Sequence, residues 1–279
     1  MLIGIVGAGV MGSGIAQSFV MEKGNQVILS DIDIEFARKG KENICQKLNS
    51  LVQKGKLSKA ECDDMAERIL VGITTDLHNC DLIIEAVKED MAVKRNLFAS
   101  LEQICAKETI FASNTSALSL SRMMEGMKRP IVGMHFFNPV PVMKLVEVIG
   151  AEGTPVDLLD QVIGIVEAIG KTPVRVKESS GFVVNRILLP MINEAIGVLS
   201  EEVASAADID TAMKLGASHP IGPIALADLI GLDVCLAVME SLHSDLQDEK
   251  YTPHPWLKEM VAKGMLGRKT GSGFYNYKQ

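Results

Sequence analysis

Short apolar runs alternate with longer amphipathic stretches over the first 180 residues of the chain. The helical spacing of apolar residues between the runs predicts helices near 13–23, 34–54, 58–68, 90–105 and 155–169. The runs themselves are rich in β-branched residues and predict strands at 2–6, 26–30, 82–86, 109–113, 131–136, 145–149 and 173–176. Because such alternation requires crossover connections, we expect an α/β domain built on a mostly parallel sheet with helices on both faces.

The pattern changes after Ser179-Ser180-Gly181, where the strand signals stop. Residues 182–203 carry apolar side chains at helical spacing with a wide buried face. Further helices are expected over 207–217, 224–243 and 255–264. We therefore predict an α/β domain over 1–180, followed by an all-α domain over 181–279.

Composition narrows the class of protein. Apolar residues make up 47% and charged residues 23%, which is typical of a globular protein and excludes a disordered or collagen-like chain. The 28 basic and 35 acidic side chains leave a net charge of −7, which argues against nucleic acid as a partner. The five cysteines form no C-x-x-C pair and are expected to be free thiols in a reducing cytoplasm. The histidines show no metal-ligand spacing, so no metal site is expected.

Residues 1–21 carry no charge, yet they do not predict a membrane span or a signal peptide. Five glycines, two serines and Gln17 interrupt the stretch, and no basic region precedes it. We expect a buried strand, a glycine turn and a buried helix, with no membrane attachment.

Gly7-Ala8-Gly9-Val10-Met11-Gly12 fits the pattern G-x-G-x-x-G between a predicted strand and a predicted helix. Gly7 would allow the tight turn, Gly9 would let the backbone approach a pyrophosphate, and Gly12 would let helix and strand pack closely. The helix N-terminus adds free N–H groups and the positive end of its dipole. Gly7, Gly9, Val10, Met11 and Gly12 are therefore candidate cofactor-binding residues in a Rossmann-type domain.

Asp31 ends the second predicted strand, where an acidic side chain accepts hydrogen bonds from the adenosine ribose and repels a 2′-phosphate. This position favours NAD, although NADP stays possible. A helix N-cap is the alternative role for Asp31.

Polar side chains also follow the later strands, at the edge where parallel sheets bind ligands. Glu85 and Glu89 follow one strand, Asn114-Thr115-Ser116 the next, and His135 and Asn138 the one after that. Each could be a turn or cap residue, but together they are expected to line one crevice.

His135 is the candidate general acid–base, because oxidation of an alcohol requires removal of a proton as hydride leaves the carbon. Such a histidine needs an acceptor on its second nitrogen. Glu147 is the only acid in the otherwise apolar run 145–149, and a buried acid needs a partner, so we choose it as that acceptor. A core histidine that is merely hydrogen-bonded is the alternative.

Residues 35–59 hold seven basic and two acidic side chains. This local excess of positive charge would suit a substrate that bears phosphates, although a solvated helix face is the preferred interpretation for most of these residues.

These residues resemble the 3-hydroxyacyl-CoA dehydrogenase family, and within it the compact bacterial 3-hydroxybutyryl-CoA dehydrogenases. The resemblance spans nearly the whole chain in order. The matching segments are 7–16, 112–116, 135–139, 143–147, 181–186, 210–216, 231–233 and 271–275. The family usually has Glu at the position of Ala225, a departure that puts one contact of the helical domain in doubt but not the chemistry.

The resemblance implies reversible NAD-dependent interconversion of (S)-3-hydroxyacyl-CoA and 3-oxoacyl-CoA, with 3-hydroxybutyryl-CoA and acetoacetyl-CoA as the substrate pair. By matching position, His135 is the general base with Glu147 as its partner, and Ser116 and Asn185 bind the reacting end of the substrate. The family's cofactor contacts fall at Asp31, Glu89, Lys94, Ser116, Asn138 and Lys269. The family's CoA contacts fall near Lys47 and Lys54. A homodimer built by the helical domain is also implied.

Two other functions stay open. A related enzyme with the same architecture could act on a free hydroxy acid, as gulonate dehydrogenase-like proteins do, but Lys47 and Lys54 argue mildly against this. A non-enzymatic NAD-binding protein is disfavoured because the four site residues are all present, namely Ser116, His135, Glu147 and Asn185.

Overall fold

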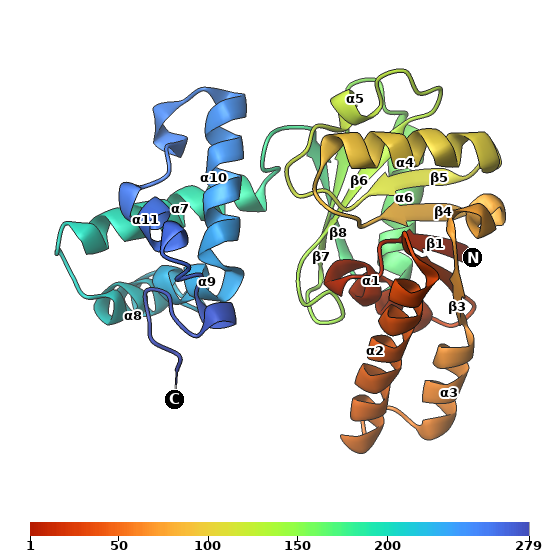
Figure 1. Ribbon diagram of the computed structural model, residues 1–279, viewed down its shortest axis with the longest axis horizontal. Helices are drawn as coiled ribbons and strands as arrows, with labels where there is room; N and C mark the ends of the chain where they lie inside the picture. Colours follow the sequence, from red (N-terminus) through yellow and green to blue (C-terminus); the bar gives the residue numbers. More distant parts are fainter. Residues whose placement is uncertain (279) are drawn as a thin grey trace. The chain divides into compact units, whose positions relative to one another are not determined.

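The computed structural model describes residues 1–278, and the chain divides into two compact units, Met1–Glu178 and Ser179 onward. The first unit holds one eight-stranded sheet in the order β3-β2-β1-β4-β5-β6-β7-β8 (Figure 1). All neighbouring strands are parallel except β6 and β7. The strands are β1 Leu2–Val6, β2 Gln26–Ser30, β3 Ile69–Gly72, β4 Leu82–Glu85, β5 Ile110–Ser113, β6 Ile131–Phe136, β7 Leu145–Gly150 and β8 Thr172–Lys177.

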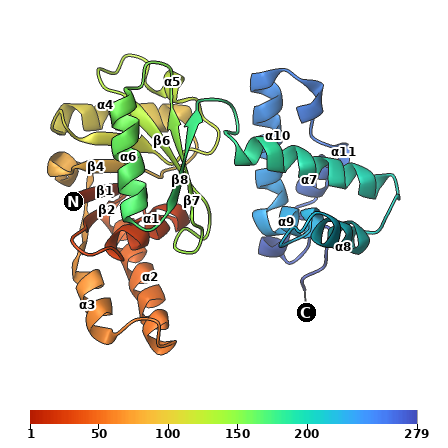
Figure 2. The ribbon, with the colours of Figure 1, turned by 180° about the vertical axis from the view of Figure 1, so that it is seen from behind.

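Helices cover both faces of this sheet, as the strand–helix alternation predicts. Helix α4 lies on one face and α6 on the other, since each is in front of the sheet in one of two opposite views (Figures 1 and 2). The helices of this unit are α1 Val10–Val20, α2 Ile34–Gln53, α3 Lys59–Glu67, α4 Met91–Ile104, α5 Leu120–Met123 and α6 Val156–Ala168, with a 3₁₀ helix η1 at Thr74–Asn79. The strand order β3-β2-β1-β4-β5-β6 is that of a Rossmann sheet, so the expected fold class is confirmed.

One apolar core joins α1, α2 and α6 to the strands. Phe19 of α1, Ile44 and Leu48 of α2 and Val162 of α6 are fully buried in the same cluster as Ile5 of β1. At about 1.5–3 kcal/mol for each large apolar side chain removed from water, this burial is a main contribution to the stability of the unit. It also holds the carboxyl ends of β1 and β2 in a fixed relation to the start of α1.

Among the described residues of the second unit, the regular elements are all helices, and the only β-structure is isolated bridges at Gly267, Ser272 and Asn276. Its helices are α7 Val184–Ser200, α8 Ala206–Gly216, α9 Pro223–Ile230, α10 Leu232–Leu246 and α11 Pro255–Ala262, with short 3₁₀ helices η2 Glu249–Tyr251 and η3 Arg268–Thr270. It has a core of its own, in which Ile196 of α7, Ile224 of α9 and Leu257 of α11 are fully buried. Across residues 1–278, no helix is both long enough and apolar enough to span a lipid bilayer.

One predicted helix was wrong, and short elements such as strand β3 and helix α5 were not predicted. The single helix expected over 224–243 is two helices, because Gly231 adopts φ 106°, a left-handed conformation that interrupts the helix. Strand β3 was not predicted: it is only four residues long and directly follows the charged helix α3. As an edge strand, it leaves Leu70 40% exposed, so its alternation of buried and exposed positions is too short to recognise.

Candidate active site

The glycine-rich turn joins β1 to α1, and the protein itself requires two of its three glycines. Gly7 has φ 102°, and a Cβ there would lie 2.5 Å from the carbonyl oxygen of Ala86. A Cβ on Gly12 would lie 1.8 Å from the carbonyl oxygen of Gly7. The turn and the close packing of α1 therefore need glycine at both positions.

Gly9 is not required by packing within the protein. A Cβ there would have no atom within 4 Å among residues 1–278, apart from those of its chain neighbours. Gly9 is the N-cap of α1, and no side chain caps this helix end. The first N–H groups of α1 are thus available to an anion, on which the helix dipole also acts favourably. Open space beside Gly9 and uncapped N–H groups fit the pyrophosphate of a dinucleotide.

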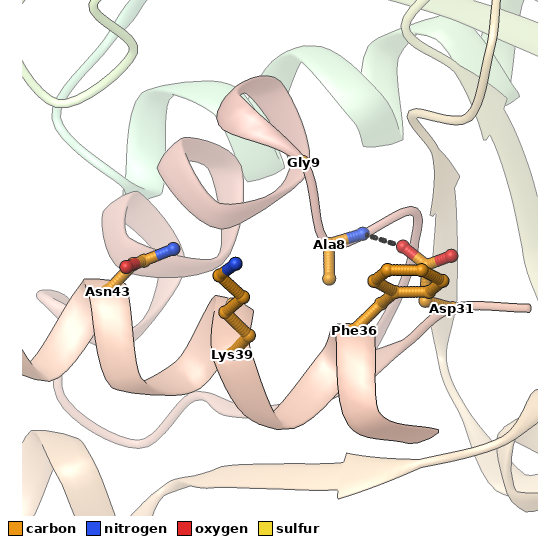
Figure 3. Close-up of a pocket in the computed structure, with 7 residues that line it drawn as sticks. Ala8, Gly9, Asp31, Phe36, Lys39 and Asn43 are labelled. Carbon is orange, nitrogen blue, oxygen red and sulfur yellow. Dashed lines mark hydrogen bonds between the residues drawn. The ribbon is translucent and has the colours of Figure 1, made fainter. Parts of the chain in front are cut away.

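Asp31 follows β2, and its carboxylate is held by two backbone donors. The N–H of Ala8 donates to Oδ2 at 2.6 Å, and the N–H of Ile32 donates to Oδ1 at 2.7 Å. These bonds fix the carboxylate beside a cavity of about 330 Å³. Figure 3 shows Asp31 and Phe36 at one end of this cavity and Lys39 and Asn43 along α2 toward Gly9. The N-cap of α2 is Asp33, so Asp31 does not have the capping role considered as its alternative.

A second cavity, of about 500 Å³, lies between the start of α1 and the middle of α2. Ser13 of α1 and Asn43, Gln46, Lys47 and Ser50 of α2 line it, together with Ala8, Gly9 and Val10. Lys54 does not line it, but lies at the C-cap of α2, two helical turns beyond Lys47. The basic cluster predicted over 35–59 therefore borders both cavities.

His135 of β6 and Glu147 of β7 form a buried pair across the antiparallel strand pair of the sheet. They lie directly opposite each other in the antiparallel ladder of β6 and β7, which places their side chains on the same face. Nδ1 of His135 lies 2.7 Å from Oε2 of Glu147, and the two side chains are 7% and 0% exposed. Since a carboxylate only accepts hydrogen bonds, Nδ1 donates to Glu147, and Nε2 is the second ring nitrogen that can carry a proton. The ring of Phe137 packs against the imidazole, with centroids 4.4 Å apart.

The strand end that carries His135 is fixed by a neighbouring segment. Asn114, just beyond β5, accepts a hydrogen bond from the backbone N–H of Phe136 at 2.9 Å through its side-chain oxygen. Asn138 is exposed in the loop that follows β6. Lys171 holds the same loop, because its buried ammonium donates to the carbonyl oxygens of Val140 at 2.6 Å and Met143 at 2.9 Å. Burial lowers the pKa of Lys171, and Lys144 adds to this effect.

Ser116 is held by Glu89, which in turn is held by Lys94. Oε1 of Glu89 accepts hydrogen bonds from the N–H of Ser116 at 2.8 Å and from the hydroxyl of Thr115 at 2.6 Å. Its Oε2 lies 2.9 Å from the ammonium of Lys94. Burial acts to raise the pKa of Glu89, but Lys94 and these hydrogen bonds outweigh it and hold the pKa below its ordinary value. Lys94 itself is only 1% exposed, and its direct contact with a cofactor stays a prediction.

Asn185 and Lys269 belong to the second unit. Asn185 is partly buried in the first turn of α7. Lys269 lies in η3 and pairs with Asp233 of α10, whose carboxylate oxygens are 2.5 and 2.6 Å from its ammonium. The direct contacts of both residues with a ligand stay predictions.

The sequence pattern did not single out Lys39 or Asn43 as cavity residues. The two residues are four positions apart on α2, which places both on the helix face that lines the cavity beside the glycine turn. This spacing is the feature of the sequence that could have identified them. Ser113, which donates to Glu85 at 2.6 Å, was also missed, because a serine inside an apolar strand has many structural roles.

Comparison with known proteins agrees with this arrangement of fold and site. Residues 2–179 match the family model of the 3-hydroxyacyl-CoA dehydrogenase NAD binding domain, and residues 181–277 match that of the C-terminal domain. The chain is 49% identical to the 3-hydroxybutyryl-CoA dehydrogenase of Clostridioides difficile, over 99% of both chains. It is 40% identical to human mitochondrial hydroxyacyl-coenzyme A dehydrogenase, over 98% of this chain and 90% of the relative.

A solved structure is similar over the full length. The crystal structure of (S)-3-hydroxybutyryl-CoA dehydrogenase PaaH1 from Ralstonia eutropha superposes with a TM-score of 0.95 at 46% identity, over 100% of this chain and 99% of that one. The Rossmann sheet with its glycine turn, together with the matching family model of a dehydrogenase NAD binding domain, defines an NAD-dependent dehydrogenase. More narrowly, the chain belongs to the 3-hydroxyacyl-CoA dehydrogenase family, whose members use NAD to act on a CH–OH group.

Proposed function

We propose that the protein is an (S)-3-hydroxybutyryl-CoA dehydrogenase that reversibly reduces acetoacetyl-CoA with NADH. The observation that carries this proposal is the buried His135–Glu147 pair, at 2.7 Å, beside the strand ends of an NAD-binding sheet. The full-length relatives named 3-hydroxybutyryl-CoA dehydrogenase support the choice of a four-carbon substrate.

The residues around the glycine turn fit NAD. The open side of Gly9 would accept the pyrophosphate, Val10, Met11 and Gly12 would offer their N–H groups, and Asp31 would bind the ribose hydroxyls. Bound NADH supplies the hydride that the reduction needs, and NAD accepts it in the reverse direction. Asp31 disfavours NADP through charge repulsion with the 2′-phosphate.

His135 would act as the general acid–base that exchanges a proton with the substrate oxygen on C3. During reduction, its Nε2 donates a proton to the oxygen on C3 of the substrate as that oxygen gains negative charge, and in oxidation Nε2 takes the proton back. Glu147 holds the ring in the required tautomer through Nδ1 and stabilises the imidazolium that forms in the oxidative direction. Because both side chains are buried, water competes little for these interactions.

Ser116 and Asn185 would bind the reacting end of the acyl group. The partly buried hydroxyl of Ser116 lies 3.3 Å from Oε1 of Glu89, which orients it while its own acceptor sites can still meet a ligand. Glu89, Asn138 and Lys269 stay proposed cofactor contacts, and Lys94 is proposed to serve that site through Glu89.

Lys47 and Lys54 would bind the phosphates of CoA. Lys47 lines the larger cavity, and both ammonium groups are exposed on α2. A free hydroxy acid would leave these lysines without a partner, which favours the CoA ester over the free acid.

The direct test is oxidation of NADH followed by absorbance, with acetoacetyl-CoA and free acetoacetate as parallel substrates. We expect rapid turnover of the CoA ester and at least a hundredfold lower kcat/KM for the free acid. NADPH serves as the coenzyme control, and we expect a lower kcat/KM for it than for NADH. Turnover confined to the free acid would move the protein to the gulonate dehydrogenase-like class. Tight NADH binding without any turnover would indicate a binding protein.

We also propose that the enzyme works as a homodimer in the cytoplasm. The helical unit exposes large apolar side chains, with Ile187 67%, Leu215 81% and Leu229 53% exposed, as expected of a surface that a second copy covers. Sedimentation velocity at micromolar concentration checks the dimer, and a single monomeric species would contradict it.

The cytoplasmic location is supported by the five cysteines, which are unpaired thiols, as a reducing compartment maintains them.

A further inference from the structure

Three buried or partly buried charged residues lie next to the segment that carries Ser116. No step of the proposed reaction uses one of them, Glu85. Glu85 is the last residue of β4 and is 0% exposed, and Lys94 of α4 is 1% exposed. The ammonium of Lys94 lies 2.7 and 2.9 Å from the two carboxylate oxygens of Glu85 and 2.9 Å from Oε2 of Glu89. We call Glu85, Lys94 and Glu89 the carboxylate–lysine cluster.

The three donors of the Lys94 ammonium are all used within this cluster. One ammonium therefore serves two carboxylates, and the formal charge of the cluster is −1. Burying a carboxylate is costly unless it is paired, so Glu85 and Glu89 share a single compensating charge. A change in one carboxylate must then alter the position of the ammonium relative to the other.

Two routes lead from Glu85 to the segment that carries Ser116. Along the first, Lys94 holds Glu89, whose Oε1 accepts hydrogen bonds from the N–H groups of Ser116 at 2.8 Å and Ala117 at 3.3 Å. Along the second, the hydroxyl of Ser113 donates to Glu85 at 2.6 Å and accepts from the N–H of Thr115 at 3.3 Å. Ser113 lies opposite Glu85 in the parallel ladder of β4 and β5, so strand register sets this contact.

The backbone after β4 is tied to the same carboxylate. The N–H of Val87 donates to Oε1 of Glu85 at 2.8 Å, and the N–H of Asn114 donates to the carbonyl oxygen of Glu85 at 2.8 Å. Glu85 thus contacts both strand ends that frame the Ser116 segment. A carboxylate with this many partners fixes the geometry of its neighbours more tightly than an apolar side chain could.

We propose that Glu85 is a positioning residue for Ser116, which it orients both through Lys94 and Glu89 and through Ser113, without touching the substrate. This inference rests on the proposed role of Ser116 at the reacting end of the acyl group. On this view, the buried charge of Glu85 keeps Ser116 in the orientation that catalysis needs. The inference predicts that mutations of Glu85 and Ser116 have non-additive effects on kcat, although no hydrogen bond joins the two residues directly.

A double-mutant cycle tests the proposal. Glu85→Gln keeps the shape of the side chain but removes its charge, so Lys94 shifts toward Glu89 and the Ser116 segment moves. We expect kcat for acetoacetyl-CoA reduction, measured at saturating NADH, to fall about tenfold. In a Ser116→Ala background, where there is no hydroxyl left to orient, Glu85→Gln is expected to lower kcat by less than about twofold.

Glu102→Gln is the matched control, because Glu102 lies on α4 with Lys94 and is largely buried at 12% exposure. Its ion pair with Arg129, at 3.9 Å, lies outside the cluster. This variant should keep wild-type kcat. Ser113→Ala is the second test variant, which removes the second route without a change in charge. We expect it to lower kcat about threefold, again only when Ser116 is present, so it provides the same test if Glu85→Gln does not fold.

The outcomes separate this proposal from the proposed function. If Glu85→Gln lowers kcat equally in both backgrounds, or leaves it unchanged in both, Glu85 does not act through Ser116. The same holds for Ser113→Ala. If Ser116→Ala alone leaves the kinetics with acetoacetyl-CoA unchanged, both the role of Ser116 and the inference from it are wrong. Loss of the Glu85→Gln effect in the Ser116→Ala background supports both.

Discussion

The glycine turn shows how single residues separate the needs of the fold from those of the cofactor. Gly12 is required by the protein, because a Cβ there would lie 1.8 Å from the carbonyl oxygen of Gly7. Gly9 has no such neighbour and has φ −67°, which any residue can adopt. The close packing at Gly12 is what the sequence motif predicts for that position, and the open space at Gly9 fits the separate role that the motif predicts there.

This difference predicts opposite behaviour of two alanine variants. Gly12→Ala should lower the free energy of unfolding by about 3 kcal/mol or more, since backbone must move. Gly9→Ala should change stability by less than about 1 kcal/mol, while its methyl group blocks the approach of the pyrophosphate and raises the Kd for NADH at least about tenfold. Urea denaturation and fluorescence titration with NADH measure the two effects. A Gly9→Ala variant that binds NADH normally would place the pyrophosphate elsewhere.

At the scale of elements, sequence patterns predicted the long, regular parts of the fold and missed the short ones. The strands at 2–6, 26–30 and 131–136 have the expected bounds, because each is a buried apolar run followed by a polar residue or a turn. Strand β3 is too short to show periodicity, and the break at Gly231 depends on a backbone conformation that periodicity does not encode.

The same contrast holds for the candidate site. The pairing of His135 with Glu147 could be predicted because a buried acid needs a partner, and strand register then brings the two together. The sharing of Lys94 between Glu85 and Glu89 could not, since it depends on where α4 lies against the ends of β4 and β5.

Helix α5 provides a prediction for pH dependence at this scale. The carboxylate of Glu178 accepts hydrogen bonds from the hydroxyl of Ser119 at 2.8 Å and the N–H of Ser121 at 3.0 Å, and also from the hydroxyl of Ser121. Ser119 is the N-cap of α5, so Glu178 stabilises the start of this helix. Partial burial acts to raise the pKa of Glu178, but these hydrogen bonds outweigh it and lower the pKa.

A lowered pKa means that the stabilisation is present above pH 4.5, the ordinary pKa, and is lost as the pH falls through the lowered value. Glu178→Gln should therefore lower the free energy of unfolding by about 1 kcal/mol at pH 7, a value reduced for partial exposure, and by less in acid. Urea denaturation at several pH values checks this, with the exposed Glu152→Gln as control. A difference that does not depend on pH would contradict the role of the ionised carboxylate.

At the scale of the whole molecule, charge is unevenly distributed. The chain carries a net charge of −7, yet residues 35–59 hold seven basic and two acidic side chains, and most of this segment is helix α2. This helix borders both cavities near the glycine turn. A basic surface on an acidic protein attracts an anionic substrate selectively to that place.

Replacing Lys47 and Lys54 together by alanine should raise the KM for acetoacetyl-CoA about tenfold, because charged hydrogen bonds to phosphate are lost. The KM for NADH should change less than about twofold, and added salt should weaken CoA-ester binding by wild type more than by the variant. Lys263→Ala is the control, since Lys263 lies outside this segment and pairs with Glu259. Equal effects on both KM values would indicate a general loss of positive potential rather than a CoA contact.

The central claim is that His135, held by Glu147, exchanges the proton at C3 of the substrate. The most direct test is kcat for NADH-dependent reduction of acetoacetyl-CoA by His135→Asn, with the Kd for NADH measured in parallel. Since loss of the imidazole leaves Glu147 buried, the double variant His135→Asn/Glu147→Gln repeats the test with a neutral pair. We predict a fall in kcat of about 10²–10⁴-fold in both variants, with NADH affinity close to wild type. A folded variant whose kcat stays within about threefold of wild type would contradict the account.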